Sequence, residues 1–147
     1  MVATQETYAQ MRSRHQKEYN DFPLGAAFSK EQFREQMEKW GLSENDTDKV
    51  VSIGYGCFIR KSDAEAFNEM NARHRKEEKD AIAADETGEG FIKGMFYYEL
   101  ANHEYGYTGD DEDAIHACGF AIREVYGNPV LYHGLELAKK EIMRDTE

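Results

Sequence analysis

The chain has 147 residues, of which 40% are hydrophobic, and its formal net charge at pH 7 is −11. This length fits a single folded domain, residues 1–147, whose core buries roughly two thirds of the surface that the unfolded chain exposes. The acidic balance argues against direct binding to nucleic acid or to an anionic membrane, and no apolar run reaches the ~18 residues that a membrane-spanning helix needs.

The two cysteines, Cys57 and Cys118, stand alone, without a nearby cysteine or histidine at metal-ligand spacing. The N-terminal segment lacks the apolar stretch of a secretory signal peptide. We therefore expect reduced thiols and a cytoplasmic location. Residues 1–4 precede the first periodic segment and are predicted to form a disordered tail.

Two helices and a β-hairpin are predicted in the first part of the chain. Residues 5–19 place apolar side chains at helical spacing. A capping box that begins at Ser29 opens a second helix, and Gly41 is its stop signal. The strand-like runs 50–53 and 57–60 flank a Gly-Tyr-Gly turn. No helix follows these glycines, so the turn is predicted to close a hairpin and not to bind phosphate.

A second capping box, at Ser62, opens a helix that is predicted to run to about Ala84. A glycine-rich break then precedes residues 91–103, whose broad apolar face is typical of the central helix of a domain. His103 is expected to be buried on that face.

Residues 106–109 are predicted to form a loop that leads into four consecutive acids, 110–113, which suit the positive end of a helix dipole. The last helix is predicted to begin at Asn128, as cap, and to end near Arg144. Together the elements predict a mainly α (α+β) fold with five or six helices and one short β-hairpin.

Two of the predicted helices share a pattern. Glu-x-Tyr-x-Gln-Met-x-x-Arg-His-x-Lys-Glu over residues 6–18 matches Glu-x-Phe-x-Glu-Met-x-x-Arg-His-x-Lys-Glu over residues 65–77. Two interpretations stay open. Either two amphipathic helices have a similar composition, or the two helices are quasi-equivalent and flank the same core or groove.

Residues 77–113, the acidic segment, contain twelve acids and two bases, and the other 110 residues contain 17 acids and 16 bases. Surplus acid can serve solubility alone. Alternatively, carboxylates displayed beside tyrosines form a surface that binds a basic partner, as a phosphate backbone does. On this interpretation the binding residues are Glu99, Glu104, Tyr105, Tyr107, Asp110, Asp111, Glu112 and Asp113.

Three segments also carry a resemblance. Residues 28–33 (FSKEQF), residues 52–61 (SIGYGCFIRK) and residues 88–105, from GEGFI to YELANHEY, resemble a group of small, acidic, uncharacterised proteins from phages and mobile elements of Gram-positive bacteria. The resemblance implies no catalytic residue. It implies a setting in which small acidic proteins disarm host defences, as anti-restriction and anti-CRISPR proteins do.

The sequence thus favours a non-catalytic interaction module that inhibits a basic, nucleic-acid-binding host defence protein, such as a nuclease, with neither cofactor nor metal. One alternative is a small metal-dependent enzyme or sensor that uses Glu99, His103, Asp113 and His116, provided that the loop at 106–109 brings two helices together. Another is an assembly subunit whose apolar central helix is buried in a homo-oligomer.

Overall fold

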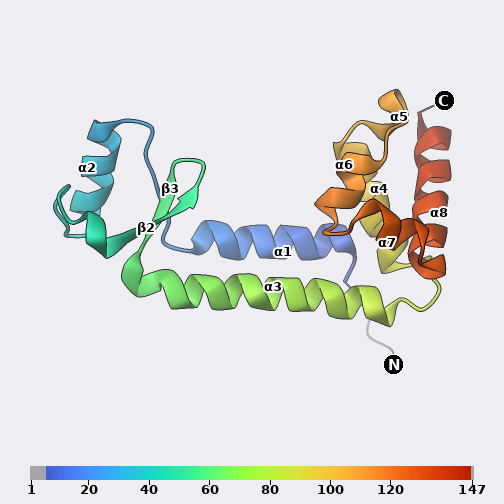
Figure 1. Cartoon of the computed structure of the whole chain (residues 1–147), viewed down its shortest axis with the longest axis horizontal. Helices are drawn as coiled ribbons and strands as arrows, with labels where there is room; N and C mark the ends of the chain where they lie inside the picture. The colour runs from blue at the N-terminus through green and yellow to red at the C-terminus, as the bar shows by residue number, and fades with distance from the viewer. Residues whose placement is uncertain (1–5, 147) are drawn as a thin grey trace. The chain divides into compact units, whose positions relative to one another are not determined.

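The computed structural model describes residues 6–146, so the predicted tail at residues 1–4 lies outside the described residues (Figure 1). The chain divides into two compact units. Unit 1 consists of Met1–Arg14 and Lys76–Glu147, and unit 2 is His15–Arg75. That residues 1–147 form one domain stays a prediction.

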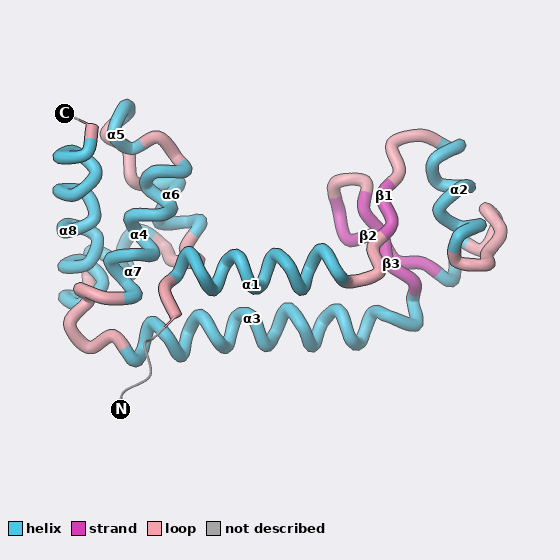
Figure 2. The backbone as a smooth tube through the Cα atoms, turned by 180° about the vertical axis from the view of Figure 1, so that it is seen from behind, coloured by secondary structure: helices cyan, strands magenta, loops and turns pink. Residues whose placement is uncertain are grey.

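The fold is mainly α with one small antiparallel sheet, as the sequence predicts (Figure 2). The described residues form eight α-helices: α1 (Tyr8–Asp21), α2 (Lys30–Lys39), α3 (Ala64–Ala84), α4 (Phe91–Asn102), α5 (Tyr105–Thr108), α6 (Glu112–Ala117), α7 (Ile122–Tyr126) and α8 (Pro129–Asp145). The prediction of five or six helices missed the short helices α5 and α7. None of the described helices combines the length and the apolar character needed to cross a membrane.

The sheet lies in unit 2 and has the order β1-β3-β2, with strands β1 (Gly25–Ala26), β2 (Val50–Gly54) and β3 (Cys57–Arg60). The predicted hairpin is confirmed, because β2 and β3 pair antiparallel around a tip with positive φ angles from Gly54 to Gly56. Strand β1 was not predicted, since two residues carry no periodic signal. The sheet and α2 meet around Phe58, whose ring lies 5.1 Å from that of Phe33 and 5.4 Å from that of Trp40.

Two of the three predicted helix caps are confirmed. The Ser29 side chain accepts the backbone N–H of Gln32 at 3.2 Å, and the Asn128 side chain accepts two N–H groups at the start of α8. The capping box at Ser62 is wrong, because that residue lies inside the 3₁₀ turn η2 (Lys61–Asp63) and α3 begins one residue after the turn. A second 3₁₀ turn, η1 (Thr47–Lys49), precedes β2.

Helix α4 is the central helix of unit 1, as predicted, and packs against α8 and α6 (Figure 2). Its buried face includes Met95, Phe96 and Leu100, each at most 1% exposed. Helix α8 comes close to the start of α4 at Gly134, where a Cβ would lie 2.6 Å from the carbonyl oxygen of Gly88. A glycine on each side therefore permits this approach.

The predicted loop at residues 106–109 is wrong, because residues 105–108 form the helix α5. Glu104 takes a left-handed backbone with φ 57°, which separates α4 from α5. Gly106 then packs on α8, where a Cβ would lie 2.8 Å from Cγ2 of Thr146. His103 follows α4 with its side chain 36% exposed, so its predicted burial is also wrong.

Candidate functional site

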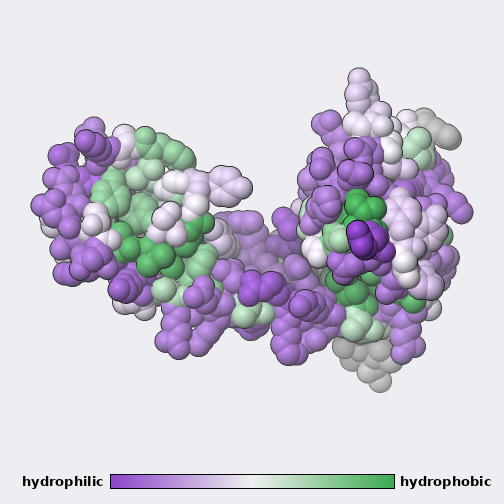
Figure 3. Space-filling view, in the orientation of Figure 1, coloured by the Kyte–Doolittle hydropathy of each residue, from purple (hydrophilic) through white to green (hydrophobic). Residues whose placement is uncertain are grey.

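The net charge lies almost wholly in unit 1. This unit holds 18 acids and 9 bases, a net charge of −9, whereas unit 2 holds 11 acids and 9 bases, a net charge of −2. On the face drawn in Figure 3, both units display some hydrophobic residues, so charge and not hydropathy distinguishes them. An acidic binding surface is therefore expected in unit 1.

Some acids of the acidic segment hold the fold together. The Asp85 carboxylate accepts the N–H groups of Gly88, Gly90 and Ile92 at 2.9–3.1 Å and so anchors the turn before α4. Glu99 is 4% exposed and accepts a hydrogen bond from the Tyr8 hydroxyl at 3.0 Å. Because Glu99 is buried, it does not lie on an exposed acidic face, contrary to its expected role.

Asp111 also has a structural role. Its carboxylate receives Nζ of Lys139 at 2.8 Å and the Tyr126 hydroxyl at 2.5 Å, which ties the start of α6 to α8. Burial raises the pKa of Asp111, but the hydrogen bonds from Lys139 and Tyr126 outweigh burial and hold the pKa below its usual range. The Tyr105 ring is half-buried with Nζ of Lys139 5.7 Å from its centroid. Because of these contacts, Asp111 and Tyr105 do not belong to the exposed residues that a partner could bind.

The remaining predicted residues are exposed and lie close together in the chain. We define the acidic surface as Glu104, Tyr107, Asp110, Glu112 and Asp113. The Tyr107 side chain is 90% exposed. The Asp110 carboxylate accepts the N–H of Glu112 at 2.9 Å, which holds the turn into α6. Glu112 and Asp113 lie in the first turn of α6, where the helix dipole favours negative charge, as predicted.

An open groove of about 720 Å³ adjoins the acidic surface. Residues of α4, of the α4–α5 turn, of α5 and of the end of α8 line it, among them Tyr97, Glu104, Gly106, Tyr107, Ile142 and Asp145. Tyr97 and the residues of α8 were not among the predicted site residues. Nothing in the pattern of residues 97–107 indicates that a segment some 40 positions later would complete a groove with them.

The four predicted metal ligands do not assemble. The Glu99 Oε2 and His103 Nε2 atoms lie 3.6 Å apart, but no three His, Cys, Asp or Glu side chains of the described residues form a group that could hold a metal ion. The hypothesis that Asp113 and His116 join them in one site is therefore wrong for the described part of the chain.

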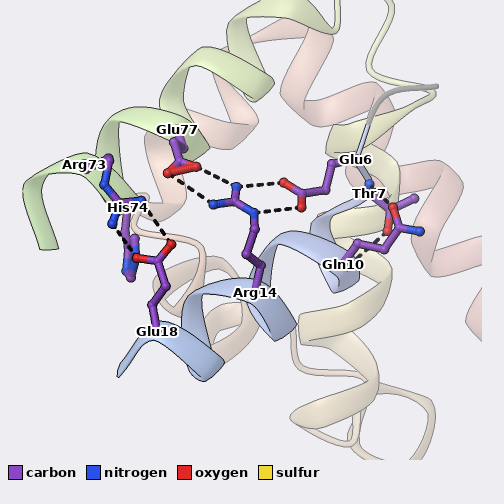
Figure 4. Close-up of polar contacts among 8 residues, drawn as sticks. All are labelled: Glu6, Thr7, Gln10, Arg14, Glu18, Arg73, His74 and Glu77. Carbon is purple, nitrogen blue, oxygen red and sulfur yellow. Dashed lines mark hydrogen bonds and ion pairs between the residues drawn. The ribbon is translucent and has the colours of Figure 1, made fainter. Parts of the chain in front are cut away.

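A second set of charged contacts joins α1 to α3 (Figure 4). In unit 1, the guanidinium of Arg14 contacts Glu6 at 2.9 Å and Glu77 at 2.5 Å. In unit 2, the Glu18 carboxylate binds Arg73 and also Nε2 of His74, the latter at 3.0 Å.

The pattern shared by residues 6–18 and 65–77 explains this pairing. Arg14 and Arg73 are equivalent in the repeated pattern, and so are Glu18 and Glu77. Each arginine thus pairs with the glutamate of the other copy. The third equivalent pair, His15 and His74, stacks ring on ring with centroids 3.8 Å apart. These contacts support the interpretation that the helices are quasi-equivalent.

We expect Glu18→Gln to lower the free energy of unfolding at pH 7 by about 1 kcal/mol, the upper range for an ion pair that solvent reaches. Hydrogen bonds from Arg73 and His74 lower the pKa of Glu18 to about 2, from an ordinary value of 4.5. A depressed pKa stabilises the fold above pH 4.5, and this stabilisation is lost as the pH falls through about 2.

Urea denaturation at several pH values between about 7 and 2 checks this expectation. The difference between the wild type and Glu18→Gln should shrink as the pH falls from about 5 to about 2, because Glu18 loses its charge in this range. Glu69→Gln makes the same change at an exposed position of unit 2, beyond the first turn of α3, and should alter stability by no more than about 0.5 kcal/mol. A difference for Glu18→Gln that grows as the pH falls below about 5 would contradict the assigned contacts.

A protein-family model described as a family of unknown function (DUF7659) matches residues 7–141. The match covers most of both units. No curated protein and no solved structure matches the chain.

Proposed function

This chain belongs to that family of unknown function, and we propose that it is a non-catalytic protein-interaction module whose acidic surface binds a basic partner protein. The observation that carries the proposal is the exposure of four carboxylates and Tyr107 within residues 104–113, in the unit that holds nearly all of the net charge.

The distinction between acids that stabilise the fold and acids that are exposed supports this function. Asp85, Glu99 and Asp111 are engaged in contacts that hold unit 1 together, so fold stability accounts for them. Glu112 and Asp113 are both exposed in the first turn of one short helix, where neighbouring like charges repel each other through solvent. A basic partner would relieve that repulsion and would be steered to the surface by long-range attraction.

In its finer form, the proposal is that the partner is a nucleic-acid-binding protein of a host defence system, which this chain inhibits by covering its phosphate-binding surface. The resemblance of residues 28–33, 52–61 and 88–105 to small acidic phage proteins supports this form. A surface that accepts phosphates accepts carboxylates for the same electrostatic reason. Duplex DNA should therefore compete with the chain for its partner.

A triple variant with Asp110→Asn, Glu112→Gln and Asp113→Asn tests the proposal. It removes three charges with little change in volume and leaves Asp111 in place. We expect affinity for the partner to fall by at least about tenfold, which corresponds to about 1.4 kcal/mol. Stability should change little, because the loss of helix-dipole interactions, about 0.3–1 kcal/mol each, is offset by reduced repulsion.

The measurement starts from a nuclease-treated lysate of the native host, passed over immobilised wild-type chain and eluted between about 50 and 500 mM salt. The dissociation constant of the eluted partner is then measured for each variant, with and without duplex DNA. The matched control replaces Glu31, Glu35 and Glu38, exposed acids of α2 in unit 2, by Gln. Equal losses in both triple variants, or binding that is indifferent to salt, would contradict the proposal.

A further inference from the structure

The groove beside the acidic surface has the dimensions of a binding site. Its volume of about 720 Å³ falls within the ~300–1,000 Å³ of ligand pockets, enough for a long side chain and its flanking backbone. Ala101, Gly106 and Ile142 supply small and apolar surface to it. Gly106 keeps α5 close to α8, since a Cβ there would meet Thr146 at 2.8 Å.

Aromatic rings contribute to the walls of the groove. Tyr107 contributes a ring that is 90% exposed and is therefore accessible to a partner. Tyr97 donates its hydroxyl proton to Oδ2 of Asp145 at 2.8 Å, and this hydrogen bond raises the pKa of Tyr97. The bond also holds the Asp145 carboxylate at the groove.

The charge of the groove is negative. Glu104 and Asp145 bring one carboxylate each, and the residues described as lining the groove include no lysine, arginine or histidine. Glu104 stands on a tight turn, because its carbonyl oxygen accepts the N–H groups of Tyr107 and Thr108, both at 3.0 Å. Two carboxylates in a groove with an exposed aromatic ring complement a cation that is flat and partly apolar.

We propose that this groove receives an arginine side chain of the basic partner, with the guanidinium against the Tyr107 ring and in contact with the carboxylates of Glu104 and Asp145. A guanidinium stacks on an aromatic face and binds carboxylates through paired N–H groups. A lysine ammonium is a strongly hydrated point charge and gains less from the same walls. This inference rests on the proposed function and adds the chemistry of the partner's anchoring residue.

Fluorescence anisotropy with labelled nona-arginine and nona-lysine at about 50 mM salt tests the inference. We expect wild-type protein to bind nona-arginine at least about fivefold more tightly than nona-lysine. Tyr107→Ala should weaken nona-arginine binding by at least about tenfold and abolish the preference, whereas Tyr107→Phe should retain both. Glu104→Gln should weaken nona-arginine more than Glu112→Gln, a matched loss of one charge outside the groove.

The outcomes separate the groove from the acidic surface. Equal affinity of the wild type for the two peptides, or undiminished nona-arginine binding by Tyr107→Ala, would overturn the groove assignment. If the triple variant at Asp110, Glu112 and Asp113 still loses its affinity for the host partner, the proposed function stands without the groove. If the triple variant binds the partner like the wild type, and the wild type shows no preference for nona-arginine over nona-lysine, both proposals fail.

Discussion

Phe96→Ala should lower the free energy of unfolding of unit 1 by about 3–5 kcal/mol. The Phe96 side chain is fully buried on α4, in the core cluster that also contains Ile115 and Leu135. Truncation removes the transfer free energy of the ring and leaves a cavity that the surrounding helices fill only in part. Since domains of this size are stable by about 5–15 kcal/mol, the loss is a large share of the total.

Urea denaturation followed by far-ultraviolet circular dichroism measures this loss. Tyr107→Ala is the control in the same unit, because it also truncates an aromatic side chain but one that is 90% exposed. It should change stability by no more than about 0.5 kcal/mol. Similar losses in the two variants would contradict the assignment of Phe96 to the core. An unchanged stability of Tyr107→Ala also ensures that its expected binding defect is not caused by unfolding.

Gly134→Ala should be destabilising by about 1–3 kcal/mol, although alanine is the better helix former by about 1 kcal/mol. The added Cβ on α8 would lie 2.6 Å from the carbonyl oxygen of Gly88 and 2.6 Å from Cγ2 of Ile92. The backbone oxygen has little freedom to move aside, because Asp85 binds the N–H groups of this turn. The steric cost should therefore exceed the gain in helix propensity.

Gly94→Ala makes the same substitution inside α4, at an exposed position where an added Cβ meets nothing within 4 Å. Here only the helix propensity changes, so we expect stability to rise by about 0.5–1 kcal/mol. Thermal and urea denaturation of the two variants should thus give opposite signs. A gain in both would mean that α8 and the turn at Gly88 do not approach each other as closely as described.

The same two helices, α4 and α8, contribute to the core of unit 1 and to the proposed groove. Helix α4 carries Tyr97 and helix α8 carries Ile142 and Asp145, so the packing of these two helices also sets the width of the groove. A variant that loosens the core is therefore expected to bind its partner more weakly because the groove changes shape. The affinities of variants must be compared under conditions in which the same fraction of each protein is folded.

Local signals in the sequence were enough to locate the long helices. The Ser29 and Asn128 caps act on N–H groups two or three residues away, so their effect is readable from neighbouring positions alone. The apolar face of residues 91–103 likewise predicts a central helix because burial repeats with the helical period. The same local reasoning failed at Ser62, where a 3₁₀ turn displaced the cap, and at α5, whose four residues are held partly by contact with α8.

The sequence around Glu99 contains a signal for its burial. This residue is preceded at helical spacing by Met95 and Phe96, on the apolar face that predicted the central helix. A carboxylate in that position either faces a buried donor or interrupts the core. The donor is the Tyr8 hydroxyl, 91 positions earlier in the chain, which no local pattern could identify.

The sequence by itself determined the amount of charge, its concentration in residues 77–113 and the helices that carry it. Only the tertiary structure decided which carboxylates are engaged and which face solvent. It pairs Asp111 with Lys139, buries Glu99, and brings Asp145 beside Tyr97 and Glu104. It also showed that the arginines and glutamates of the pattern shared by residues 6–18 and 65–77 pair across two helices. The physical reason is that electrostatic interactions and burial depend on distance in space, which separation along the chain does not reveal.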